Sequence, residues 1–120
     1  MNTYQLASEP LVPAHQHGIS TPVIRFDREP GDCELCIEGA FDAQTVGDIN
    51  PAIEAVVADH PHHVTLDLGG VSLMDSSGVG ALLGLWKRMK AYDGSLVIAH
   101  AHDQPLMMLK LLKLDRAFGI

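Results

Sequence analysis

The sequence predicts a single α/β domain in which strands and helices alternate. Val64, Leu66 and Leu68 alternate with polar residues, which is the two-residue period of a strand. Apolar residues then recur at helical spacing over residues 79–89, and a second short apolar run follows at 96–99. Because strands that are joined through helices usually pair in parallel within one sheet, these observations favour βαβ connections.

Composition and charge exclude several classes of function. The chain has 120 residues, enough for one hydrophobic core, and 47% of them are hydrophobic. The formal net charge of −7 argues against attraction to nucleic acid or to an anionic membrane. No stretch reaches the ~20 apolar residues of a membrane span, and the N-terminus lacks a secretory signal. We therefore expect a cytoplasmic protein that binds neither membranes nor nucleic acid.

The N-terminal part predicts a lead-in followed by a hairpin. Residues 1–21 contain prolines, a glycine and no sustained periodicity, so we expect them to be flexible and place the domain at 22–120. Short apolar segments at 23–26 and 33–38 flank a Pro-Gly turn, which predicts two antiparallel strands. Together with the later strands, they predict a mixed sheet of four to five strands with helices packed mainly on one face.

Cys33 and Cys36 form a C-x-x-C pair within the second of these strands. Redox pairs of this kind open a helix, and a zinc site needs two further ligands. Residues three apart on a strand point to opposite faces of the sheet. We therefore interpret both cysteines as ordinary strand residues and expect neither a metal site nor a redox role.

Two further amphipathic helices are expected, one before the central strand and one at the C-terminal end of the chain. Each has a proline near its start. The apolar face of the first is made up of Val46, Ile49, Ile53, Val56 and Val57. Because proline suits the first position of a helix, we expect regular helix from Pro51, with Asn50 as the N-cap and a looser turn before it. The alternative is a helical turn that begins earlier and meets a kink at Pro51. The last helix would begin at Gln104, with Pro105 at its first position. Its buried side chains would be Leu106, Met108, Leu109, Leu112 and Phe118.

The tetrapeptide at 75–78, Asp-Ser-Ser-Gly, connects the central strand to the central helix. Asp75 is a natural N-cap, and a helix N-terminus tolerates an anion such as phosphate because its first N–H groups are free. An apolar stripe of Val79, Leu82, Leu83, Trp86 and Met89 is expected to bury this helix.

Two serines occupy the first turn of this helix. Helical spacing is expected to place Ser77 along a stripe of small residues that includes Gly80 and Gly84, whereas Ser76 leans toward the apolar side. A face of small residues beside a hydroxyl allows another backbone to come close. We therefore expect Ser77 to be the better presented hydroxyl.

The junction has two interpretations, a simple helix cap or a docking surface. Gly78, Gly80 and Gly84 each weaken a helix by up to about 1 kcal/mol relative to alanine. A sequence selected only for stability would avoid them, which shifts the balance toward a docking surface and leaves both interpretations open at this point. Neither Ser76 nor Ser77 stands in the G-x-S-x-G pattern of a nucleophile elbow, and no P-loop is present. We do not expect an enzyme.

The segment MDSSGVGALLGLWKRMK, which follows the strand VTLDL, resembles the signature of STAS domains, in particular the bacterial anti-sigma-factor antagonists. The resemblance extends with gaps from Val23 to the last residue. It includes a G-x-[LF]-D turn at 39–42 and the ending LKLLKLDRAFGI. Lys113 stands where the family commonly has a helix-ending glycine, and relatives usually add a further short helix beyond the position of Ile120.

The resemblance implies a STAS-like fold and a role as an anti-sigma-factor antagonist in partner switching. In that family an anti-sigma-factor serine kinase phosphorylates a hydroxyl of the D-S-[ST]-G loop, which here is Ser77, with Ser76 as the alternative. The kinase is the expected partner, a phosphatase is a further candidate partner, and ATP and magnesium belong to the kinase, so no cofactor is expected. The expected partner-binding residues are Asp42, Asp75, Ser76, Ser77, Gly78, Gly80 and Gly84. The alternative is a STAS adaptor or scaffold subunit that does not switch, in a stressosome-like particle or beside a transporter. The oligomeric state stays open.

Overall fold

The computed structural model describes residues 23–26 and 31–120. The expected lead-in at 1–21 and most of the hairpin turn lie outside the described residues. The described elements follow in the order β1 (Val23–Phe26), β2 (Asp32–Phe41), α2 (Val46–Ala58), β3 (His63–Met74), α3 (Ser76–Lys90), β4 (Ser95–Ala99), α4 (Asp103–Leu111) and α5 (Asp115–Phe118).

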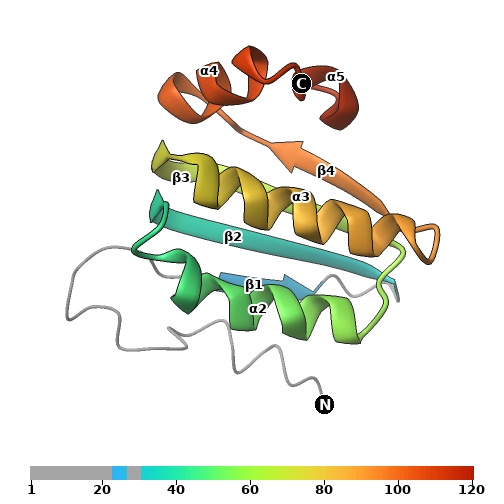
Figure 1. Ribbon diagram of the computed structural model, residues 1–120. Helices are drawn as coiled ribbons and strands as arrows, with labels where there is room; N and C mark the ends of the chain where they lie inside the picture. Colours follow the sequence, from blue (N-terminus) through green and yellow to red (C-terminus); the bar gives the residue numbers. More distant parts are fainter. Residues whose placement is uncertain (1–22, 27–30) are drawn as a thin grey trace.

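The strands form one sheet in the order β1-β2-β3-β4 (Figure 1). β2, β3 and β4 pair in parallel, as the alternation of strands and helices predicts, and β1 pairs antiparallel with β2, as the hairpin pattern predicts. The expectation of a four- to five-stranded mixed sheet is met in part. The parallel body has three strands, β1 adds one short antiparallel edge, and the described residues contain no fifth strand.

β3 is longer than the alternation at Val64, Leu66 and Leu68 suggests. It continues through Gly69 and Gly70 into a further apolar segment at 71–74. Cys36 of β2 pairs with Asp67, but Glu38 pairs with Gly70, so the register shifts within the sheet. A second shift brings Phe41 opposite Met74. Register shifts of this kind bend a strand and redirect its end. They place the ends of β2 and β3 side by side at the junction with α3.

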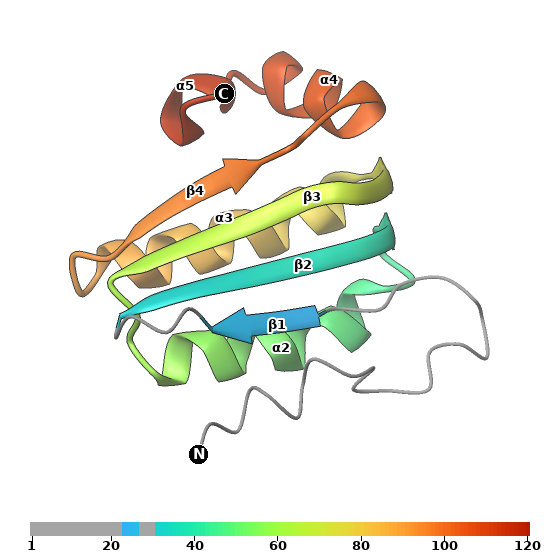
Figure 2. The same ribbon diagram turned by 180° about the vertical axis from the view of Figure 1, so that it is seen from behind.

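Helices α2 and α3 cover one face of the sheet, and α4 and α5 lie along the β4 edge (Figure 1). Figure 2 shows the opposite face, over which none of the described helices lies. The core therefore forms between the sheet and the helix pair. Its largest fully buried side chains are Phe41, Leu35, Ile37, Ile49, Leu66, Leu68, Met74, Leu82, Leu85, Met89 and Leu109.

The apolar stripe of α3 is rotated slightly from the predicted one. Leu85 is fully buried, although the sequence pattern did not include it, whereas Leu83 and Trp86 are only partly buried. Trp86 lies at the border toward α5, where its ring meets Phe118 edge-on at 5.5 Å between centroids. The contact with α5 explains why an aromatic residue occurs beside the stripe.

α2 begins at Val46, so the expected start of the regular helix at Pro51, with Asn50 as the N-cap, is wrong. Val46 N–H donates to the Asp42 carbonyl (2.9 Å) and Ile49 N–H to the Thr45 carbonyl (3.1 Å). The turn formed by Asp42 and Thr45 therefore starts the helix before Pro51. Pro51 is exposed within the helix, where it has no N–H to donate to the carbonyl four residues earlier.

The C-terminal part differs from the expectation in two ways. α4 begins at Asp103, one residue earlier than predicted. Leu109 and Phe118 are buried as expected, but the side chain of Leu112 is 49% exposed and contributes little to the core. Lys113 has φ +61°, which is the left-handed conformation that a helix-ending glycine would adopt at low cost.

None of the described helices combines the length and the apolar run that a bilayer span requires.

Candidate functional site

Asp75 caps the N-terminus of α3, as the sequence predicts. Its Oδ1 accepts hydrogen bonds from the N–H groups of Ser77 (2.8 Å) and Gly78 (3.1 Å). The Asp75 backbone is extended, with φ −119° and ψ −170°, which is typical of an N-cap. The first two helical residues are therefore the two serines, held in a fixed turn.

The other carboxylate oxygen of Asp75 joins this turn to the β2–α2 loop. Oδ2 accepts a hydrogen bond from the N–H of Ala43 (3.1 Å). Asp42, the preceding residue, uses its own Oδ1 to accept hydrogen bonds from the N–H groups of Gln44 (3.0 Å) and Thr45 (3.2 Å). The carboxylates of Asp42 and Asp75 thus both hold backbone N–H groups, and together they join the β2–α2 loop to the start of α3.

Thr45 is the fully buried polar side chain at the centre of this loop. Its hydroxyl donates to the Ala40 carbonyl (2.9 Å) and accepts from the N–H of Asp42 (3.0 Å). Sequence reasoning missed it, although the spacing Asp-x-x-Thr before a helix is a turn signal. Thr45 therefore fixes the loop that Asp75 contacts.

The hydrogen bonds to Asp75 also set its charge. Desolvation opposes ionisation, but the backbone N–H groups of Gly78, Ala43 and Ser77 together outweigh it and hold the pKa of Asp75 below its ordinary value. The carboxylate is therefore ionised at neutral pH. It places a negative charge at the N-terminus of α3, where Ser76 and Ser77 form the first turn.

The exposure of the two serines is the reverse of the expectation. Ser76 is exposed, whereas Ser77 is half-buried. The reason is helical geometry, because side chains four residues apart share a face. Ser76 is aligned with Gly80 and Gly84, whereas Ser77 precedes the buried Leu85 by eight residues, two steps of four along the same helix face. The expectation that Ser77 is the better presented hydroxyl is therefore wrong.

The three glycines of this region differ in what surrounds them. A Cβ on Gly78 would lie 2.1 Å from the Phe41 carbonyl oxygen, so this buried glycine lets α3 approach the end of β2. A Cβ on Gly80 or on Gly84 would meet nothing within 4 Å. Gly80 and Gly84 therefore present bare helix surface in line with Ser76, whereas the position of Gly78 is explained by internal packing alone.

Gln104 supports the junction from α4. Its side-chain oxygen accepts the N–H of Met74 (2.7 Å), and its Nε2 donates to the Met74 carbonyl (2.8 Å). The amide thus pairs with the last residue of β3 as a neighbouring strand would. No local signal could have identified Gln104, because its partner is distant in the sequence.

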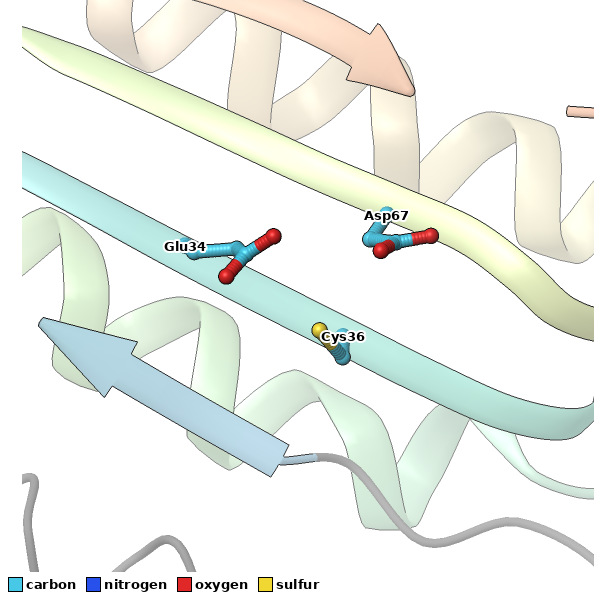
Figure 3. A group of neighbouring side chains, drawn as sticks. All are labelled: Glu34, Cys36 and Asp67. Atoms are coloured by element: carbon cyan, nitrogen blue, oxygen red, sulfur yellow. The ribbon is translucent and has the colours of Figure 1, made fainter. Parts of the chain in front are cut away.

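The two cysteines lie on opposite faces of β2, as the strand pattern predicts. Cys33 is 4% exposed, and burial, with the nearby charges of Asp59 and Glu34, raises its pKa to about 12, so it stays a thiol. Figure 3 shows Cys36 on the face away from the helices, with Glu34 and Asp67. One ligand-type atom from each of these three lies within 4.8 Å of the others. Exposed acidic groups are common without a metal, so this group supports no metal assignment.

Comparison with known proteins gives a consistent result. The family model described as "STAS domain" matches residues 24–120. The anti-sigma-B factor antagonist of Listeria monocytogenes is 25% identical over 89 residues, which cover 74% of this chain and 78% of the relative.

Solved structures share the fold. An anti-sigma factor antagonist from Mycobacterium paratuberculosis superposes with a TM-score of 0.70 at 23% identity and covers 82% of this chain and 83% of its own. The phosphorylated form of SpoIIAA, a Bacillus cell fate determinant, has a TM-score of 0.62 at 19% identity, with 78% and 86% coverage. At these identities the likeness shows the fold, and the family match extends from β1 across the Asp75 junction to Ile120. The chain belongs to the STAS domain family.

Proposed function

We propose that this protein is an anti-sigma-factor antagonist that binds an anti-sigma-factor serine kinase and is released when the kinase phosphorylates it. The observation that carries the proposal is the exposed hydroxyl of Ser76 in line with the open surface at Gly80 and Gly84. The relative from Listeria monocytogenes is named an anti-sigma-B factor antagonist, which supports the proposal. The protein is a substrate in this scheme, and ATP and magnesium come with the kinase.

The first turns of α3 and the β2–α2 loop form the proposed docking surface. Glycines without side chains allow another backbone to approach a helix closely. Asp75 holds the loop and the helix in one arrangement through its bonds to Ala43 and Ser77, so the surface is organised before a partner binds. Gly78 does not belong to this surface, because it is buried against Phe41.

Ser76 is the acceptor that we place first, and Ser77 is the second. A kinase must reach the hydroxyl oxygen with the γ-phosphate of ATP, which requires access. Ser76 is exposed and Ser77 is half-buried, and this difference supports Ser76.

Phosphorylation would act as a local charge switch. A phosphate on Ser76 adds roughly −1.5 to −2 charge next to the ionised Asp75. Asp75 already accepts the N–H groups of Ser77 and Gly78, so the phosphate would not find those donors free. In a close interface, repulsion and desolvation of about 3–4 kcal/mol would weaken affinity several-hundredfold.

The test is phosphorylation by a candidate anti-sigma-factor serine kinase with ATP and magnesium, followed by intact mass and site mapping. We expect a gain of one phosphate that Ser76→Ala abolishes. Ser77→Ala and Ser72→Ala, the latter at an exposed position of β3, should retain it. If the phosphate maps to Ser77, then Ser77 rather than Ser76 is the acceptor, and the proposed switch is otherwise unchanged.

A binding measurement separates the switch from the alternative of an adaptor that does not switch. The unmodified protein should bind the kinase, and the phosphorylated protein should not. Binding that persists at equal affinity after phosphorylation, or binding with no phosphate transferred, would contradict the switch and favour the adaptor.

A further inference from the structure

Two side chains at the start of α4 hold this helix against β3. Gln104 pairs with both backbone groups of Met74. His102, the N-cap residue, has Nε2 2.9 Å from the carbonyl oxygen of Gly69 and Nδ1 2.8 Å from Oδ2 of Asp103. His102 therefore bridges the start of α4 and the bent part of β3.

Both ring nitrogens of His102 face oxygen atoms that can only accept hydrogen bonds. A neutral imidazole has one N–H donor and one lone pair, so it satisfies one of the two oxygens, whereas the imidazolium donates to both. We propose that His102 is a pH-sensitive latch, whose protonated ring fastens the start of α4 to β3 through the Gly69 carbonyl. The neutral ring keeps its one proton on Nδ1, because the charged carboxylate of Asp103 is a stronger acceptor than a carbonyl, so deprotonation releases the Nε2 contact with Gly69.

The backbone around His102 is consistent with a loop that is held by specific contacts. His100 has φ +62° and Asp103 has φ +53°. Residues other than glycine rarely adopt this left-handed conformation, and they keep it where surrounding contacts impose it. The hydrogen bonds of the His102 ring to β3 and to α4 are contacts of this kind.

The charged groups that face His102 favour its protonated form. The carbonyl of Gly69 and then the carboxylate of Asp103 raise the pKa of His102 through hydrogen bonds, desolvation lowers it, and the charge of Asp103 raises it further. The next carboxylate on β3, Asp67, accepts the N–H of Gly69 (2.8 Å) and lies 3.2 Å from Nδ1 of His100. The net effect of Gly69, Asp103 and desolvation is a raised pKa of His102.

The sign of the pH effect follows from this direction. Because the pKa of His102 is higher in the folded chain, the latch contributes fully below the pKa of the unfolded chain. Its contribution is lost as pH rises through the folded-state pKa. The side chain of His102 is 50% exposed, so solvent screens the effect, and we expect opening at the start of α4 rather than global unfolding.

The experiment is NMR on the full chain, with two readouts. The first is the titration of the His102 ring, compared with the same histidine in a peptide of residues 98–106. The second is the hydrogen-exchange protection of the Met74 N–H, which donates to Gln104 and therefore reports whether α4 is docked. We expect an upward shift of the His102 pKa relative to the peptide, and a loss of Met74 protection as pH rises through it.

Two variants make the test specific. In His102→Gln the amide can donate to Gly69 at every pH, so the protection of Met74 should no longer depend on pH. In Asp103→Asn the carboxylate is lost, while asparagine tolerates the left-handed backbone, so the His102 pKa should move back toward that of the peptide. A His102 pKa at or below the peptide value overturns the latch. Met74 protection that varies with pH equally in His102→Gln also overturns it.

Discussion

Gly78 and Gly80 lie two residues apart on α3, yet they serve different purposes. A Cβ on Gly78 would collide with the Phe41 carbonyl oxygen, whereas one on Gly80 would meet nothing within 4 Å, and Gly84 repeats the situation of Gly80. The fold requires the first glycine and gains nothing from the other two. The difference teaches that one side of this helix is shaped by internal packing and the other is left bare in line with Ser76.

The largest effect is expected from Gly78→Ala. The added methyl group would lie 2.1 Å from a backbone oxygen, and a backbone cannot move aside as a flexible side chain can. We expect a loss of about 3 kcal/mol in the free energy of unfolding, measured by urea denaturation. Gly47→Ala, in open space on α2, is the control and should not destabilise the protein. Equal stability of the two variants would remove the distinction between packed and bare glycines.

The next effect concerns Thr45, the buried residue of the loop that contacts Asp75. Thr45→Val keeps the shape but removes the hydroxyl, which leaves the Ala40 carbonyl and the Asp42 N–H without this partner. We expect a loss of about 1–3 kcal/mol in the free energy of unfolding. Thr65→Val on the uncovered face of the sheet is the control, with a change of about 0.5 kcal/mol or less. A small effect at Thr45 would mean that the loop does not depend on its hydroxyl.

Local patterns were sufficient for part of this arrangement. The alternation at Val64, Leu66 and Leu68 identified β3, and the Asp75 cap followed from its place before a helical period. The assignment of the serines failed for a local reason, since spacing by four residues would have aligned Ser76 with the bare glycines. The prediction for the start of α2 failed because the pattern of apolar residues does not reveal the hydrogen-bonded turn of Asp42 and Thr45, which begins the helix before Pro51.

Other features could not be predicted from one sequence. The contrast between Gly78 and Gly80 depends on where Phe41 lies, which only the packing of β2 against α3 decides. The pairing of Gln104 with Met74 depends in the same way on the position of α4. Tertiary contacts of this kind leave no periodic signal in the residues that make them.

A smaller effect that depends on pH is expected from Asp75→Asn. Asparagine can still cap α3 through its oxygen, but it loses the charge and the acceptor for the Ala43 N–H. Because the folded-state pKa of Asp75 is lowered, its contribution is present above the unfolded-state pKa and is lost as pH falls through the folded-state pKa. The difference in urea midpoint between wild type and variant should therefore be largest near neutral pH and shrink toward about pH 3. A difference that grows in acid would contradict this role for Asp75.

The smallest effect on folding, and the most informative for function, is expected from Gly80→Ala and Gly84→Ala. Each replaces a poor helix former in open space, so each should raise the free energy of unfolding by up to about 1 kcal/mol. If the bare surface is where the kinase docks, the same methyl groups should weaken binding about tenfold, which corresponds to about 1.4 kcal/mol. Calorimetric titration of the kinase measures the affinity, and Gly47→Ala on α2 controls for a stabilising change elsewhere. A more stable protein that binds less well cannot be explained by damage to the fold, so this combination would assign the bare glycines to the interface. Unchanged affinity in both variants would show that the partner does not touch this side of α3.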